Sequence, residues 1–130
     1  MAHEFDLRVY YEDTDLAGIV YYANYLKFIE RARSEWVRGL GVDQVAMRAA
    51  GLVFAVRRVV ADYLRPAVYD DVLKVKTALL DVGGARLRLE QVVWRGDERL
   101  FTAEVTLVCI GPDGQVARLP QVLRAKTVTA

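Results

Sequence analysis

Two carboxylates stand two positions apart in a short segment that comes just before a long helical pattern. Asp13 and Asp15 lie in the run Tyr11–Tyr25, which also contains a glycine, Gly18, and several tyrosines. A carboxylate can attack as a nucleophile or remove a proton as a base. The unpaired N–H groups at a helix start can stabilise a developing negative charge. The segment therefore predicts a site in which an acid and a helix start act together.

The residue inventory excludes several other kinds of active site. The chain has one histidine, His3, one cysteine, Cys109, and one serine, Ser34. A Ser–His–Asp or Cys–His site would depend on His3, which lies close to the N-terminus. A His/Cys zinc site lacks ligands, and the Asp-x-Asp pair has no further clustered oxygen ligands for a divalent cation. We therefore expect no metal and no cofactor, and a chemistry based on carboxylates, backbone groups or water.

The composition predicts a cytoplasmic protein. The net charge is +1 without a basic block, so nucleic acid is not an expected partner. The longest run without a charged residue, Leu16–Leu26, has eleven residues, and a membrane-spanning helix needs about 20. The charged N-terminus does not resemble a signal peptide. A single cysteine excludes an internal disulfide, which also favours the cytoplasm.

The length and the apolar content predict one domain that associates with itself. The 130 residues suffice for a single core, so we expect one domain spanning residues 1–130. Hydrophobic residues make up 54% of the chain, which indicates either a rich core or apolar surface buried between subunits. Burial of apolar surface between subunits is favoured, because small domains have much surface for their volume.

Hydrophobic periodicity predicts an α+β domain. A period of two indicates strands and a period of 3.6 indicates helices. The pattern gives a strand at 4–11, a helix at about 22–40, a short helix at 42–50, and strands at 52–64, 73–79, 87–93 and 101–109. The predicted apolar stripe of the long helix consists of Leu26, Ile29, Ala32/Arg33, Trp36 and Leu40. The tail from Arg118 is ambiguous. Short turns join antiparallel neighbours, so we expect a curved sheet wrapped on the long helix, with a free face or edge for a partner subunit.

The motif segment resembles the signature of a known family. The run Tyr11–Tyr25, continued by Leu26–Arg33, is similar to hotdog-fold thioesterases of the 4-hydroxybenzoyl-CoA type. It is closest to the tol-pal system-associated, YbgC-like acyl-CoA thioesterases. Asp70–Leu73 and the strand layout also agree, so the resemblance covers nearly the whole chain. It implies a hotdog fold with about five strands, hydrolysis of acyl-CoA thioesters without a cofactor, and a homodimer or homotetramer.

The resemblance also implies roles for individual residues. Asp15 corresponds to the catalytic carboxylate, and the backbone N–H of Tyr22 would polarise the thioester carbonyl. Gly18 lets the loop bend close to the substrate. Many tol-pal-associated relatives carry a histidine at the position of Tyr22, so here Asp15 would act without a histidine side chain. Whether Asp15 is a nucleophile or a general base stays open.

Other residues are candidate contacts for the substrate. They are the polar and aromatic residues of the helix start and three arginines on predicted strands: Tyr21, Asn24, Tyr25, Arg57, Arg58 and Arg86. The tyrosines could instead be core or interface residues, and Asn24 could cap the helix or hold the loop. The arginines could bind the phosphates of coenzyme A or lie on a solvated sheet face.

Two other functions stay open at this stage. A hotdog dehydratase normally needs a histidine near the reacting bond, and no histidine lies in the motif segment. A non-catalytic module that binds acyl-carrier protein or a lipid-synthesis partner would need no catalytic group. Release of free thiol from acyl-CoA separates hydrolysis from both alternatives.

Overall fold

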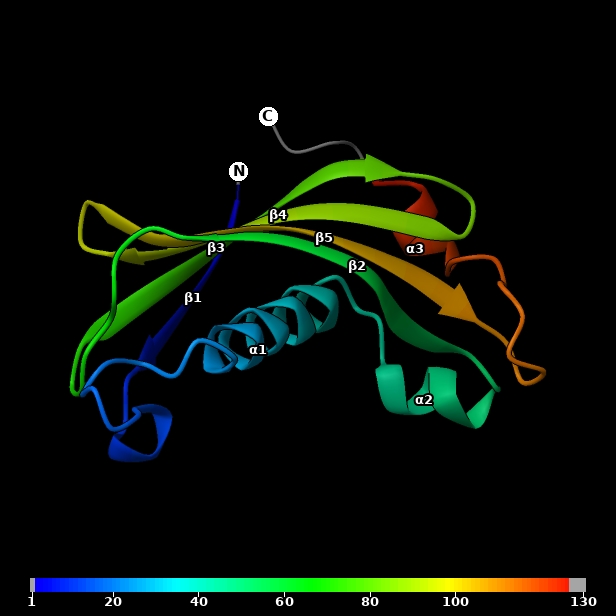
Figure 1. Ribbon diagram of the computed structural model, residues 1–130. Helices are drawn as coiled ribbons and strands as arrows, with labels where there is room; N and C mark the ends of the chain where they lie inside the picture. Colours follow the sequence, from blue (N-terminus) through cyan, green and yellow to red (C-terminus); the bar gives the residue numbers. More distant parts are fainter. Residues whose placement is uncertain (1, 127–130) are drawn as a thin grey trace.

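A curved antiparallel sheet forms the frame of the molecule (Figure 1). The computed structural model describes residues 2–126. Within them the strands follow the order β1-β3-β4-β5-β2, and every neighbouring pair is antiparallel. Their bounds are β1 (His3–Arg8), β2 (Val53–Tyr63), β3 (Val72–Val82), β4 (Arg86–Arg95) and β5 (Glu98–Ile110). The expected α+β class and strand arrangement are confirmed.

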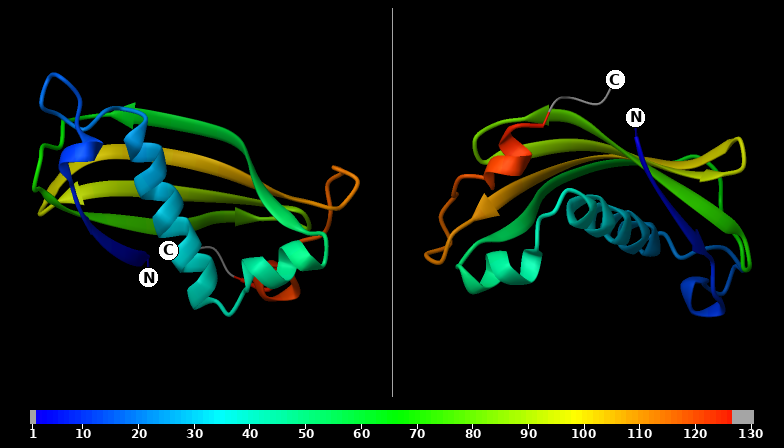
Figure 2. Two further views of the ribbon diagram at one scale, coloured as in Figure 1. Left: turned by 90° about the horizontal axis from the view of Figure 1, so that it is seen from below. Right: turned by 180° about the vertical axis from the view of Figure 1, so that it is seen from behind.

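The long helix α1 (Asn24–Gly39) crosses the concave face of the sheet, as the view from below in Figure 2 shows. Its buried face holds Tyr25, Phe28, Ile29, Ala32, Arg33 and Val37. The predicted stripe shares Ile29, Ala32 and Arg33 with this face, and its Trp36 and Leu40 are partly buried against the core. It is wrong at Leu26, which is exposed. The helix is rotated so that the rings of Tyr25 and Phe28 enter the core, which removes more apolar surface from water.

Two short helices complete the described chain. Helix α2 (Gln44–Ala49) begins after Asp43, whose carboxylate accepts hydrogen bonds from the N–H groups of Val45 and Ala46. Such an N-cap satisfies donors that the helix itself leaves free. Helix α3 (Gln121–Arg124) forms in the tail that the sequence leaves ambiguous, and its Leu123 is fully buried in the main core.

The first strand ends earlier than predicted. Strand β1 stops at Arg8, whereas the alternating pattern continues to Tyr11. Residues Tyr11–Asp13 instead form a short 3-10 helix, η1, because the Asp13 carboxylate accepts a hydrogen bond from the Tyr10 N–H. A local bond between a side chain and the backbone competes here with continuation of the strand. This early stop gives the motif segment its starting point.

The two sheet edges differ in character. Strand β1 places Glu4, Asp6 and Arg8 on one of its faces, and Lys74 of β3 binds both acids. Strand β2 exposes the valines Val56, Val59 and Val60 next to the charged Arg57, Arg58 and Asp62, and Val60 keeps 49% of its surface in contact with solvent. An apolar edge strand is a template for pairing with another chain, and soluble proteins usually protect such edges with charge. In the single chain, β2 is thus the edge strand that leaves several valines exposed.

A buried polar cluster ties α1 to the centre of the sheet. Gln91 is fully buried, and its amide donates hydrogen bonds to the Ile29 carbonyl and to the Thr77 hydroxyl, both at 2.9 Å. The Gln91 oxygen accepts a hydrogen bond from Arg33 at 3.0 Å. Burial lowers the pKa of Arg33, opposed by the charge of Glu30. The cluster fixes the helix against β3 and β4, and it also compensates a buried guanidinium.

We expect Gln91→Leu to lower the free energy of unfolding by about 2–4 kcal/mol, because it leaves Arg33 buried without its acceptor. Urea titration measures the change. The double variant Arg33→Met/Gln91→Leu removes both partners and should recover most of the loss. A double variant as unstable as Gln91→Leu would show that Arg33 does not depend on Gln91.

Candidate active site

The segment between β1 and α1 folds as a small hairpin held at both ends. The N–H of Tyr21 donates to the Asp13 carbonyl, and the N–H of Asp15 donates to the Ile19 carbonyl, both at 2.9 Å. The same segment is attached to the loop 64–71, because the Val20 N–H donates to the Ala67 carbonyl at 2.9 Å. Asp13 therefore shapes this loop through its carbonyl.

Asp15 stands at the turn of this hairpin and is exposed in the single chain. Its carboxylate accepts a hydrogen bond from the Ala17 N–H at 2.9 Å, and its carbonyl accepts one from the Gly18 N–H. Gly18 has a φ angle of +81°, which side-chain-bearing residues rarely adopt. Gly18 thus lets the chain reverse directly beside the Asp15 carboxylate, which is the bend that the sequence predicts.

Asp15 and Gly18 share one open cavity. Its volume is about 770 Å³, and it is lined by Tyr11, Thr14, Asp15, Leu16, Gly18 and Tyr69. We call this the Asp15 cavity. Two of its walls are tyrosine rings from distant parts of the chain, and Tyr11 and Tyr69 meet edge to face at 6.5 Å.

Asn24 holds the loop rather than capping the helix. Its side-chain amide donates to the Asp13 carbonyl at 2.9 Å, the same oxygen that accepts the Tyr21 N–H. The residue at the cap position is Ala23, which has no side chain that could bind the helix N–H groups. Of the alternatives that the sequence leaves open for Asn24, the structure supports the loop contact.

The start of α1 keeps backbone donors free. Among residues 2–126, neither the Tyr22 N–H nor the Ala23 N–H has an acceptor, whereas the Tyr21 and Asn24 N–H groups are both bound. Free N–H groups at a helix start carry partial positive charge and can bind an anionic oxygen. The N–H of Tyr22, the predicted oxyanion donor, is therefore available together with that of Ala23, between the bound N–H groups of Tyr21 and Asn24.

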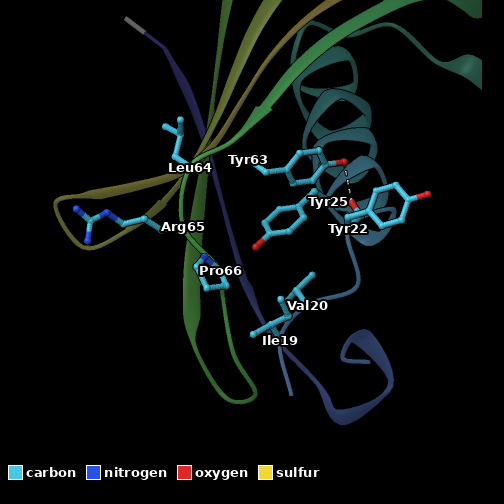
Figure 3. Close-up of a pocket in the computed structure, with 8 residues that line it drawn as sticks. All are labelled: Ile19, Val20, Tyr22, Tyr25, Tyr63, Leu64, Arg65 and Pro66. Carbon is cyan, nitrogen blue, oxygen red and sulfur yellow. Dashed lines mark hydrogen bonds between the residues drawn. The ribbon is translucent and has the colours of Figure 1, made fainter. Parts of the chain in front are cut away.

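Three tyrosines form the wall of a second cavity, drawn in Figure 3. Its volume is about 290 Å³, and it is lined by Ile19, Val20, Tyr22, Tyr25, Tyr63, Leu64, Arg65 and Pro66. We call it the tyrosine cavity. Tyr25 is almost fully buried, stacks on Phe101 at 5.0 Å and accepts the Ala67 N–H at its hydroxyl. Burial raises the pKa of Tyr25, so this hydroxyl stays neutral.

Tyr63 is a site residue that the sequence reasoning missed. It ends strand β2, and its hydroxyl donates to the Tyr22 carbonyl at 3.0 Å (Figure 3). Its ring lies between those of Tyr22 and Phe101, at 6.1 and 5.0 Å. An aromatic residue that closes a predicted strand just before a Pro-containing turn is the only signal that the sequence offered.

Ion pairs fix the loop 64–71, which supplies walls to both cavities. Arg95 donates to the Asp71 carboxylate at 2.7 Å and to the Pro66 carbonyl at 3.3 Å. Arg95 also binds Glu98, and this hydrogen bond lowers the pKa of Glu98. Asp71 in turn accepts the Val68 N–H at 2.9 Å. The turn at Asp70–Asp71 is therefore held from the neighbouring hairpin of β4 and β5.

The predicted arginine contacts lie away from these cavities in the single chain. Arg57 and Arg58 are exposed at an irregularity in β2. Arg86 pairs with Val108, seven residues along β5 from the Phe101 that faces Tyr63, which is about 23 Å of strand. Arg65 lines the tyrosine cavity instead, and it forms an ion pair with Glu98 at 3.1 Å.

The structure divides the predicted site residues into two groups. Asp15 and Gly18 line one cavity, and Tyr22 and Tyr25 line the other, with no residue common to both. Tyr21 is exposed beside Tyr22, at 5.0 Å between ring centres. Within residues 2–126 no group of three or more possible metal ligands is present, and no helix is long and apolar enough to span a bilayer.

Comparisons with known proteins place this fold and this loop in one family. The model of the thioesterase-like superfamily matches residues 9–127. The acyl-CoA thioester hydrolase YbgC of Escherichia coli O6:H1 is 40% identical over 107 residues, which is 82% of this chain and 80% of that protein. YbgC of Haemophilus influenzae, an acyl-CoA thioesterase, is 42% identical over 107 residues, 82% of this chain and 79% of that protein.

A solved structure agrees with the family model and with these two relatives. The probable thioesterase from Bartonella henselae has a TM-score of 0.89 and 39% identity, and the match covers 92% of this chain and all of that one. The chain belongs to the thioesterase-like superfamily, and the hotdog resemblance seen in the sequence is confirmed.

We expect Gly18→Ala to lower the free energy of unfolding by about 1–2 kcal/mol, because alanine strains the backbone at positive φ. An added Cβ would meet nothing within 4 Å, so crowding does not contribute. Gly18→Asn should cost less, since asparagine tolerates this conformation better. Thermal unfolding compares the two variants, and equal stability of Gly18→Ala and wild type would contradict the strain argument.

Proposed function

We propose that this chain hydrolyses acyl-CoA thioesters to a free acid and CoA. Three facts support the proposal: the membership of the thioesterase-like superfamily, the relatives named as acyl-CoA thioesterases, and the arrangement of the motif segment. The observation that carries it is the free N–H of Tyr22, which lies with that of Ala23 between the bound N–H groups of Tyr21 and Asn24, because such a donor needs no rearrangement to bind a developing oxyanion.

Asp15 supplies the reacting carboxylate in this proposal. In one route its oxygen attacks the thioester carbonyl carbon, the carbon–sulfur bond breaks with departure of CoA thiolate, and water then cleaves the mixed anhydride. In the other route Asp15 takes a proton from a water molecule whose oxygen attacks the same carbon, and the carbon–sulfur bond then breaks with departure of CoA thiolate. In both routes the carbonyl oxygen becomes negative and the Tyr22 N–H binds it.

We expect Asp15→Asn to lower kcat by at least about a hundredfold, because an amide neither attacks nor accepts the proton. The Asp15 side-chain oxygen that accepts the Ala17 N–H persists in asparagine, so the loop should keep its shape. Release of free thiol from a series of acyl-CoA substrates measures turnover, and circular dichroism checks the fold. A correctly folded variant with wild-type turnover would refute the role of Asp15.

A second copy of the chain completes the site in our proposal. Asp15 is exposed in the single chain, and the tyrosine cavity opens beside the end of the apolar edge strand β2. Pairing of β2 with another copy would bury Val56, Val59 and Val60 and bring new walls to the cavities. Exclusion of water strengthens the electrostatic interactions on which catalysis depends. We therefore propose a homodimer, which could pair further into a homotetramer.

We expect Val60→Lys to weaken this association, because a charged side chain on an edge strand opposes pairing. Val45→Lys, the same exchange at an exposed valine of α2, is the matched control. Analytical ultracentrifugation should show a dimer or tetramer for wild type and the control, and a monomer-enriched population for Val60→Lys. Identical sedimentation of both variants would exclude β2 as the interface.

The cellular setting is proposed from the resemblance alone. It comprises a cytoplasmic location, an association with the tol-pal envelope system, and acyl-carrier protein as a possible alternative carrier to CoA. The thiol-release measurement with acyl-CoA and with acyl-carrier protein thioesters would show which carrier is used.

A further inference from the structure

One carbonyl at the start of α1 is bound by a side chain instead of by the helix. The Tyr21 carbonyl accepts the Asn24 N–H at 2.8 Å, and the Ala23 carbonyl accepts the Leu26 N–H at 3.2 Å. The Tyr22 carbonyl between them accepts the hydroxyl of Tyr63 at 3.0 Å, across 41 residues of sequence. The last residue of β2 therefore reaches the peptide that follows the free Tyr22 N–H.

This contact fixes the direction of backbone donors. A trans peptide is planar, so its N–H points away from its carbonyl. Binding of the Tyr22 carbonyl by Tyr63 therefore sets the direction of the Ala23 N–H. Binding of the Tyr21 carbonyl by Asn24 sets the direction of the Tyr22 N–H in the same way. The two free N–H groups of the helix start consequently keep a fixed angle to each other.

The surroundings keep Tyr63 in place as a donor. Its ring packs against Tyr22, Tyr25 and Phe101 at 5.0–6.1 Å between centres. Tyr25 and Phe101 are buried, so they form a rigid support for the ring. Desolvation raises the pKa of Tyr63, with a smaller contribution from Tyr22. The hydroxyl therefore retains its proton at neutral pH.

We propose that Tyr63 is a positioning residue, whose hydroxyl holds the Tyr22–Ala23 peptide so that the Ala23 N–H points to the thioester carbonyl beside the Tyr22 N–H. Tyr63 acts through the peptide that carries the Ala23 N–H, and this role rests on the proposed hydrolase function. Loss of the hydroxyl should affect the transition state more than the bound substrate, because the oxyanion forms only in the former.

The decisive variant is Tyr63→Phe, which keeps the ring and removes only the hydroxyl. We expect kcat to fall about tenfold, because a small misalignment of an oxyanion donor is costly, while KM changes less than about twofold. The thermal midpoint should stay close to that of wild type. Tyr10→Phe is the matched control, since Tyr10 is exposed and lines neither cavity, and its kinetics should match those of wild type.

A spectroscopic signature tests the contact without activity. The sequence contains a single Tyr–Ala pair, Tyr22–Ala23. Isotope labels on tyrosine carbonyl carbons and alanine nitrogens therefore give one resonance in an NMR experiment that detects labelled peptide bonds. In Tyr63→Phe the carbonyl resonance should move upfield, as expected for loss of a hydrogen bond, and in Tyr10→Phe it should not move.

The outcomes separate the two proposals. A shifted resonance together with a lower kcat and an unchanged KM supports the positioning role. An active Tyr63→Phe enzyme with wild-type kcat overturns it and leaves the hydrolase proposal intact. A wild-type protein that releases no thiol from any acyl-CoA, from acetyl to palmitoyl, overturns the hydrolase proposal and the catalytic role of Tyr63 with it. An unmoved resonance would refute the contact itself.

Discussion

The carbonyl oxygen of Asp13 is the contact on which the site depends. It accepts the Tyr21 N–H and the Asn24 side chain at once, each at 2.9 Å. These bonds join the loop that carries Asp15 to the first turn of α1. Without them the acid and the helix start would belong to independently moving segments. Holding the two in one relative position would then cost conformational entropy in every reaction. The oxygen is a backbone atom, so the role does not depend on the side chain of Asp13.

The remainder of the fold keeps this junction in place. The Gln91 cluster holds α1 against the central strands, and the Arg95–Asp71 ion pair holds the loop 64–71 that meets the motif segment. The motif segment is thus attached to the helix on one side and to the sheet on the other. Edge strand β2 contributes Tyr63 to the helix start and leaves its apolar surface uncovered. The strand that we propose pairs with a second copy is therefore the strand whose Tyr63 binds the Tyr22–Ala23 peptide at the start of α1.

Local patterns predicted the fold well and the site only in part. The strands and the long helix follow from period and turn chemistry, which depend on neighbours in sequence. The rotation of α1 toward Tyr25 and the early end of β1 depend on competing contacts, which periodicity alone does not rank. Asp15 and Gly18 could be found from the motif, because a short loop brings them together. Tyr63 could not, because its hydrogen bond spans 41 residues and leaves no pattern around it.

The most direct test of the account is a crystal structure with a non-hydrolysable ketone analogue of an acyl-CoA. The account predicts that the analogue's carbonyl oxygen lies about 2.7–3.1 Å from the Tyr22 nitrogen, with the Asp15 carboxylate within hydrogen-bond or one-water reach of the reacting carbon. It also predicts that a second copy closes the cavities along β2. A carbonyl bound away from the start of α1, or Asp15 directed into bulk water in that complex, would contradict it.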